Sequence, residues 1–144
     1  MHEGVDTSYT KYAANNGGPD NSIYNVAPPP PEGTLYVGWT EPGEWFNLTV
    51  EVAEKGKYAV DLHYTCNHGG EISLDLNQKP IGSAINIPST ADPKDPIGWR
   101  QWHHWNMLKE CAVLDLPKGV SVLTVHINKE GNMNLCTLEF RRKE

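Results

Sequence analysis

Apolar and polar residues alternate along much of this chain, in short runs that are broken by turn residues. The clearest run starts at Trp45, where Phe46, Leu48, Val50 and Val52 take every second position and polar residues take most of the positions between them. Successive side chains of a β-strand point to opposite faces, so this run predicts a strand with one buried face. A chain made mostly of such runs folds into β-sheets.

Seven further runs have the same character, and no window shows the 3.6-residue period of a helix. The predicted strands lie at residues 35–39, 45–53, 57–66, 70–77, 79–87, 102–116, 120–128 and 134–142. Turn signals separate them at intervals of about 8 to 12 residues, which is typical of an antiparallel β-sandwich or jelly roll. The Asn-, Gly- and Pro-rich residues 1–34 and the Pro-rich residues 88–98 are expected to be loops.

Length and charge narrow the class of protein. The chain has 144 residues, which predicts a single domain over residues 1–144 with a real core. Its net charge is -6 and its basic residues are scattered, so we expect no nucleic-acid partner. No apolar run approaches the roughly 20 residues that a membrane span needs. The chain enters turn-rich sequence directly after Met1, and we expect it to be a fragment of a longer protein.

Three cysteines, Cys66, Cys111 and Cys136, have neither the spacing nor the histidine partners of a zinc finger. We expect them to be small core residues. The odd count leaves at least one thiol free, and a bridge from Cys66 to either of the other two stays open.

The tryptophans divide by their position relative to turns. Trp39 stands just before a Pro-Gly turn, where a large ring has little core to fill and suits a ligand platform. Trp45 and Trp102 fall at strand positions and are expected in the core. Trp105 follows two histidines, and we expect it to pack or to lie at a rim.

Seven short motifs follow one another in an order that resembles family 6 carbohydrate-binding modules and their relatives in family 35. The motifs are Gly38-Trp39-Thr40-Glu41-Pro42-Gly43-Glu44-Trp45, Val50-Glu51-Val52, Lys55-Gly56-Lys57-Tyr58, Gly69-Gly70-Glu71-Ile72, Gly98-Trp99-Arg100-Gln101-Trp102, Leu116-Pro117-Lys118-Gly119 and Gly131-Asn132-Met133-Asn134-Leu135. The resemblance covers nearly the whole chain. It implies a jelly-roll β-sandwich of two antiparallel sheets, similar to galactose-binding domains, that binds sugar and performs no reaction.

The resemblance also implies a site in the loops at one edge of the sandwich, where two aromatic rings flank a sugar and an Asn amide binds its hydroxyls. The matching residues are Trp39, Trp99 and Asn134, with Asn132 as the alternative if the last strand is shifted in register. The chemistry suits this task, because the C–H face of a pyranose packs on an aromatic ring and an amide pairs with hydroxyls as donor and acceptor.

A structural calcium ion is common in such modules, but this chain departs from their pattern. It has no Glu-Ala-Glu strand before Glu3, and Cys136 stands where the family often has an oxygen-bearing residue. Calcium prefers oxygen ligands, so these departures argue against the ion. If calcium is bound, the available early carboxylates are Glu3, Asp6 and Asp20. No other cofactor is implied.

Three functions remain open from sequence. The first is a secreted, periplasmic or cell-surface module that binds oligo- or polysaccharide and targets the catalytic domain of a parent glycoside hydrolase. The second is a structural or protein-binding sandwich that has lost its sugar site. The third, a small hydrolase, needs a carboxylate pair that no spacing singles out. A metal site at His103 and His104 is not expected, because adjacent residues of a strand face opposite ways.

Overall fold

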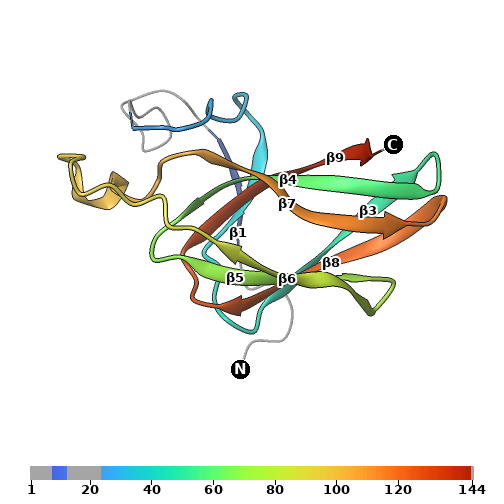
Figure 1. Cartoon of the computed structure of the whole chain (residues 1–144). Helices are drawn as coiled ribbons and strands as arrows, with labels where there is room; N and C mark the ends of the chain where they lie inside the picture. The colour runs from blue at the N-terminus through green and yellow to red at the C-terminus, as the bar shows by residue number, and fades with distance from the viewer. Residues whose placement is uncertain (1–7, 13–23, 144) are drawn as a thin grey trace.

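The computed structural model describes residues 8–12 and 24–143, and these form two antiparallel β-sheets packed face to face (Figure 1). The strands are β1 (Ser8–Lys11), β2 (Leu35–Gly38), β3 (Trp45–Val52), β4 (Gly56–Cys66), β5 (Gly70–Leu76), β6 (Lys79–Ile87), β7 (Asn106–Leu116), β8 (Gly119–Lys129) and β9 (Met133–Lys143). The larger sheet has the order β1-β2-β9-β4-β7 and the smaller sheet the order β3-β8-β5-β6. The expected all-β sandwich is confirmed, whereas the prediction that all of residues 1–34 are loop was wrong, because Ser8–Lys11 pairs with β2 as strand β1.

The main core lies between the two sheets. Val60 and Leu62 of β4 face Leu123 and Val125 of β8, and all four are almost completely buried. Alternation along the strands places these residues on the inner faces, where removal of apolar surface from water stabilises the fold by about 25 cal/mol per Å². Within the described part of the chain, no helix is long and apolar enough to cross a membrane.

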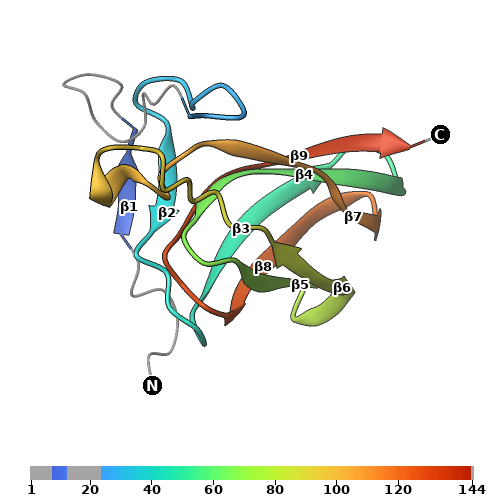
Figure 2. The ribbon, with the colours of Figure 1, turned by 60° about the vertical axis from the view of Figure 1, so that its left-hand side comes forward.

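A second, smaller core covers part of the outer face of the larger sheet. Trp105 is fully buried there, with its ring edge-on to Tyr12 and Tyr36 at centroid distances of 6.3 and 5.5 Å. The backbone N–H groups of Val26 and Ala27 both donate to the carbonyl of Trp105, which ties down the segment that runs beside β1 and β2 (Figure 2). Trp105 therefore packs, as expected, and fixes the start of β7.

Two tryptophans differ from the prediction. Trp45 is not in the core: it lies on the outer face of the smaller sheet with 37% of its surface exposed, because nothing in the described chain covers that face. Trp102 is half-buried in a turn, since the strand predicted from residue 102 begins only at Asn106, after the short 3₁₀ helix η1 (Gly98–Arg100) and that turn.

The cysteines are all free thiols. Cys66 is fully buried in the main core, and burial raises its pKa to about 11. Cys111 and Cys136 are half-buried, so the expectation of core cysteines holds fully for Cys66 alone. The bridge that the sequence left open is not formed.

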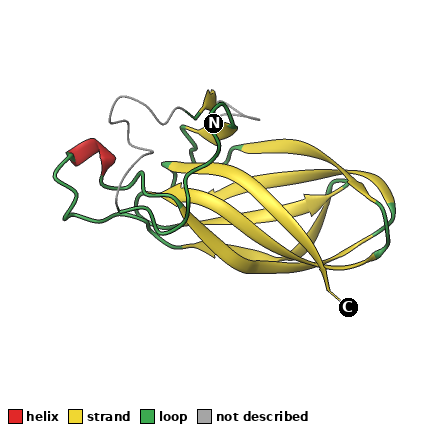
Figure 3. Ribbon diagram, turned by 90° about the horizontal axis from the view of Figure 1, so that it is seen from above, coloured by secondary structure: helices red, strands yellow, loops and turns green. Residues whose placement is uncertain are grey.

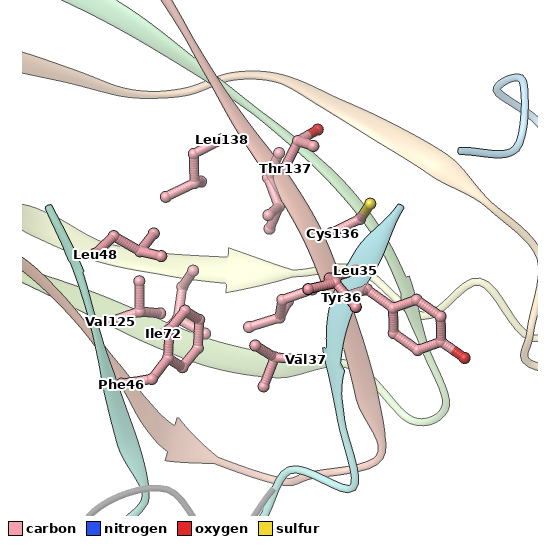
Figure 4. A pocket seen from close by; sticks show the side chains of 12 residues that line it. Leu35, Tyr36, Val37, Phe46, Leu48, Ile72, Val125, Cys136, Thr137 and Leu138 are labelled. Atoms are coloured by element: carbon pink, nitrogen blue, oxygen red, sulfur yellow. The ribbon is translucent and has the colours of Figure 1, made fainter. Parts of the chain in front are cut away.

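An apolar pocket of about 220 Å³ opens at the side of the sandwich where β2 begins. The strand β2 is short and its register with β9 extends over one pair, Val37 with Leu135. Past that pair the side chains of Leu48 and Leu138 line the pocket from β3 and β9 (Figure 4). The core is therefore less completely closed here than between the long strands.

The direction of the strands decides which connections meet. The connections that follow β2 to β8 lie at alternate ends of the sandwich, so residues 39–44, 67–69, 88–105 and 130–132 lie at the same end. Figure 3 shows this end with its long loops and η1, opposite the short hairpin turns. Segments far apart in sequence are thereby brought together.

Candidate functional site

Four connections are hydrogen-bonded to one another at the loop end of the sandwich. The N–H of Asn132 donates to the carbonyl of Thr40 (3.0 Å), and the N–H of Asn67 donates to the carbonyl of Asn132 (3.2 Å). The N–H of Thr90 in turn donates to the carbonyl of Cys66 (2.8 Å). These bonds join the three short connections and the long loop 88–105 into one surface.

Trp39 projects from this surface at the end of β2. Its side chain is 76% exposed and its backbone has a φ of 58°, a left-handed conformation that a bulky residue rarely adopts. The next residue is held firmly, because Thr40 Oγ1 donates to the carbonyl of Met133 (3.2 Å) and accepts from its N–H (3.0 Å). The sequence thus presents Trp39 to solvent from a turn fixed to the start of β9.

Trp99 projects from η1 within the long loop, with 58% of its surface exposed. The loop folds around the carboxylate of Asp95, which is completely buried. Arg100 donates to this carboxylate through Nε (2.7 Å) and a terminal nitrogen (2.8 Å), and the N–H of Ile97 donates to it as well (3.0 Å). Chiefly because of the Arg100 hydrogen bonds, the pKa of Asp95 lies well below its usual range.

His104 joins the loop to the sandwich. Its Nε2 lies 2.9 Å from Asp95 Oδ2 and its Nδ1 lies 2.9 Å from the carbonyl oxygen of Thr90. Thr90 Oγ1 accepts from the N–H of Cys66 (2.9 Å) at the end of β4 and donates to the carbonyl of Trp102 (2.7 Å). The loop that carries Trp99 is therefore an ordered element with a polar interior.

Asn134 bonds to the loop that carries Trp99, and its side chain lies near Gly38, the last residue of β2 before Trp39. Its Nδ2 donates to Thr65 Oγ1 (2.9 Å) and lies 3.3 Å from His103 Nδ1. A Cβ added at Gly38 would stand 3.0 Å from Asn134 Oδ1. The side chain is 4% exposed, so Asn134 is nearly enclosed by these neighbours.

Asn132, the alternative to Asn134, has a different place. Its side chain is exposed, and its backbone has a φ of 53° in the turn between β8 and β9. It is Asn134, at the second position of β9, whose amide faces the interior of the loop end.

His103 was missed as a site residue by sequence reasoning, which considered it only as half of a metal site. Its ring stacks on Trp102 with centroids 3.7 Å apart and meets Trp99 edge-on at 6.4 Å. The premise that His103 and His104 lie on a strand was wrong, because both precede β7. The signal for a role of His103 was its position directly after the Gly98-Trp99-Arg100-Gln101-Trp102 motif.

No group of three or more His, Cys, Asp or Glu side chains that could hold a metal ion occurs within residues 8–12 and 24–143. The three candidate calcium ligands, Glu3, Asp6 and Asp20, lie outside the described residues. At Cys136, where the family often has an oxygen ligand, burial raises the thiol pKa to about 11. A thiol that stays protonated is a poor ligand for a hard cation.

A second surface with an exposed aromatic ring lies on the outer face of the smaller sheet. Here Trp45 and Asn47 of β3 line a shallow hollow together with Asp75, Thr124 and His126. Two hydrogen bonds order its polar groups: Thr124 Oγ1 donates to Asn47 Oδ1 (2.6 Å), and His126 Nε2 lies 2.9 Å from Asp75 Oδ2. This face combines a ring with fixed donors and acceptors.

Comparison with solved structures identifies the class of fold. A family 35 carbohydrate-binding module from Clostridium thermocellum has a TM-score of 0.64 at 17% identity, covering 96% of this chain and 90% of that chain. A family 35 module from Paenibacillus barcinonensis has a TM-score of 0.66 at 10% identity, covering 96% and 91%. A family 6 module of Cellvibrio mixtus lichenase 5A, solved with cellotriose, has a TM-score of 0.59 at 19% identity, covering 78% and 80%.

No protein-family model and no curated protein sequence matches the chain. The structural likeness at these low identities concerns the fold. The chain is a β-sandwich with the fold of family 35 and family 6 carbohydrate-binding modules.

Proposed function

We propose that this chain is a non-catalytic carbohydrate-binding module whose main site is the loop end of the sandwich. The observation that carries the proposal is the pair of exposed tryptophans, Trp39 and Trp99, on connections that are hydrogen-bonded to the start of β9: Thr40 bonds to Met133, and Asn134 bonds to His103. Each ring offers a flat apolar surface for the C–H face of a pyranose, and the polar groups around Asn134 suit hydroxyls.

Two features of the site favour a ligand role over a structural one. Had the sandwich lost its site, we would expect Trp39 and Trp99 to be both buried and far apart, whereas both are exposed. The loop that carries Trp99 is held by the buried Asp95 and Arg100, so its ring is presented from an ordered backbone and loses little conformational entropy on binding.

Two buried carboxylates, Asp61 and Asp95, are held in ion pairs, and this makes them unsuited to act as the general acid of a hydrolase. Arg141 bonds to Asp61, and Arg100 bonds to Asp95, and in each case the pKa of the carboxyl group falls well below its usual range. A glycosidase general acid needs a raised pKa instead. These groups support structure, and we infer that any catalysis belongs to another domain of a parent chain.

The biological role that follows is tethering. A module that holds a glycoside hydrolase on oligo- or polysaccharide raises the local concentration of substrate without adding a reaction. A site with two stacking rings makes few contacts, so we expect a Kd on the order of micromolar to millimolar. Because such polymers are met outside the cell, we propose a secreted, periplasmic or cell-surface location.

The outer face of the smaller sheet is a second candidate surface for sugar. Trp45 stands beside ordered polar groups there, which is the same combination of ring and hydrogen-bonding side chains as at the loop end. The residues of this face lie on strands of the smaller sheet, whereas Trp39 and Trp99 lie in connections at the loop end. Substitutions on one surface therefore leave the residues of the other surface in place.

Affinity electrophoresis in gels that contain soluble xylan, mixed-linkage β-glucan, galactan or glycol chitosan tests the main proposal. We expect retardation in at least one gel, and loss of that retardation in Trp39→Ala and in Trp99→Ala. Val120→Ala, which alters an exposed apolar residue at the far end of β8, is the matched control and should migrate like the wild type. Retardation that survives both tryptophan substitutions would remove the loop end as the site.

A further inference from the structure

The amide nitrogen of Asn134 is already committed to the protein. Its nitrogen carries two hydrogens, and two acceptor positions receive them: Thr65 Oγ1 at 2.9 Å and His103 Nδ1 at 3.3 Å. With 4% of the side chain exposed, Asn134 has little surface left for a ligand. A sugar hydroxyl that accepts a hydrogen bond at this end of the sandwich therefore needs another donor.

His103 is placed to be that partner. It is half-buried, its ring stacks on Trp102 and its edge meets Trp99, which is the exposed ring of the proposed site. Its backbone N–H donates to the carbonyl of Arg100 at 2.9 Å, so it belongs to the same ordered turn. Among the described residues, Asn134 is the one side chain that hydrogen-bonds to its ring.

The hydrogen bond from Asn134 selects the tautomer of His103. An amide NH₂ group can only donate, so Nδ1 acts as the acceptor and the ring proton sits on Nε2. Burial, with a smaller contribution from the neighbouring His104, lowers the pKa of His103 to about 4, which keeps the ring neutral at neutral pH. A neutral ring held in this tautomer presents one N–H donor on the side opposite Asn134.

We propose that His103 is a sugar-contacting residue of the loop site, donating from Nε2–H to a hydroxyl of a pyranose stacked on Trp99, and that Asn134 acts as the positioning residue that fixes its tautomer. This inference rests on the proposed function of the loop end. It assigns the direct polar contact to a residue outside the Trp39, Trp99 and Asn134 set, and it requires an acceptor oxygen on the sugar beside the stacked face.

Two substitutions of His103 test the contributions of its aromatic ring and of its N–H group separately. His103→Phe keeps an aromatic ring against Trp102 but has no N–H, whereas His103→Gln keeps an N–H donor on a side chain that extends as far as Nε2. We expect His103→Phe to weaken binding of the polysaccharide that retards the wild type by at least tenfold, and His103→Gln to restore part of it. Val120→Ala, which alters an exposed residue outside both candidate surfaces, is the control and should bind like the wild type.

The sugar affinity measured as a function of pH distinguishes protonation of His103 from a mere loss of packing. The titratable groups around His103 are His104 beside it in the loop and, through His104, the Asp95–Arg100 pair. Protonation of Nδ1 removes the acceptor for Asn134, so wild-type affinity should fall as the pH approaches 4. The affinity that remains in His103→Phe should lack this step.

Nitrogen-detected NMR of the wild-type protein covers the case in which a variant fails to fold. Spectra assigned on the wild-type protein should show an Nε2–H tautomer for His103, and its Nε2 resonance should shift when a soluble oligosaccharide of the retarding polysaccharide is added. An Nδ1–H tautomer, or full affinity in His103→Phe, would overturn the inference. If Trp99→Ala abolishes binding while His103→Phe does not, only the role of His103 fails; if Trp99→Ala has no effect, the proposed site itself fails.

Discussion

Arg100 donates two hydrogen bonds, of 2.7 and 2.8 Å, to the buried carboxylate of Asp95 within the loop that carries Trp99. The carboxylate has no exposed surface, whereas 14% of the Arg100 side chain is exposed. Removal of one charge from a buried pair leaves the other without its partner, which costs about 3–5 kcal/mol in measured cases. The pair therefore links the order of the loop to the stability of the protein.

Asp95→Asn should accordingly lower the free energy of unfolding by about 3 kcal/mol and weaken sugar binding, because the position of Trp99 depends on this loop. Denaturant unfolding and affinity electrophoresis measure the two effects. Asp115→Asn is the control: its pair with Lys57 is exposed, and such pairs contribute about 0–1 kcal/mol. Equal effects of both substitutions would contradict the role given to Asp95.

Acid should destabilise the fold in two stages. The pKa of His103 is lowered from 6.5 to about 4, so between these pH values the unfolded chain binds the extra proton and stability falls by roughly 1.4 kcal/mol per pH unit at most. Asp61 and Asp95 have a pKa below their usual 3.8, so the stability from their ion pairs is present above that pH and is lost below it.

The Tm as a function of pH tests this order of events. His103→Phe should flatten the decline between pH 6.5 and about 4 and leave the decline at lower pH unchanged. A variant curve parallel to the wild type over the whole range would show that His103 does not titrate differently in the folded and unfolded states.

Gly131→Ala should damage the support of Trp39. A Cβ at Gly131 would lie 2.2 Å from the carbonyl oxygen of Thr40, so the turn at residues 130–132 and the turn after Trp39 cannot keep their contact. We expect a loss of about 1–3 kcal/mol, as for other overpacked sites, together with weaker sugar retention.

Gly98→Ala is the matched control, because a Cβ there meets nothing within 4 Å and the residue directly precedes Trp99. Its stability and binding should stay close to those of the wild type. If Gly131→Ala is equally well tolerated, the two turns are not held together as described.

Trp45→Ala separates the two proposed surfaces. Since Trp45 is partly exposed on the sheet face, its removal should lower the free energy of unfolding by about 1 kcal/mol, against about 3–5 kcal/mol for Trp105→Ala in the second core. Calorimetry with a soluble oligosaccharide should show binding at the loop end unchanged. A fall in stoichiometry would support a second site on the sheet face, and unchanged stoichiometry would argue against one.

The strands were largely predictable because alternation is a local property of the chain. The run from Trp45 to Val52 is β3 as observed, and its apolar set, represented by Phe46, does face the core. The strand predicted from residue 102 was too long by four residues, because Asp95 and His104 draw the backbone before Asn106 into a loop through contacts that alternation does not encode.

The site was predictable in part. The exposure of Trp39 and Trp99 agrees with their positions in loops, whereas the ligand roles of these residues and of Asn134 remain predictions. Beyond its position after the Trp99 motif, sequence gives no indication of the role proposed for His103, since that role depends on the amide of Asn134 in β9, 31 residues further along the chain.

The sequence by itself determined that the chain forms strands, because side-chain alternation follows from local geometry. That the connections of Trp39 and Trp99 lie at one end was expected only from the resemblance, because the order of strands in a sheet is a tertiary property. Tertiary structure decided which faces are covered. The outer face of the larger sheet is covered by Trp105 and its neighbours, while that of the smaller sheet leaves Trp45 exposed. Burial of a ring depends on whether another segment removes it from water, and no local pattern specifies that segment.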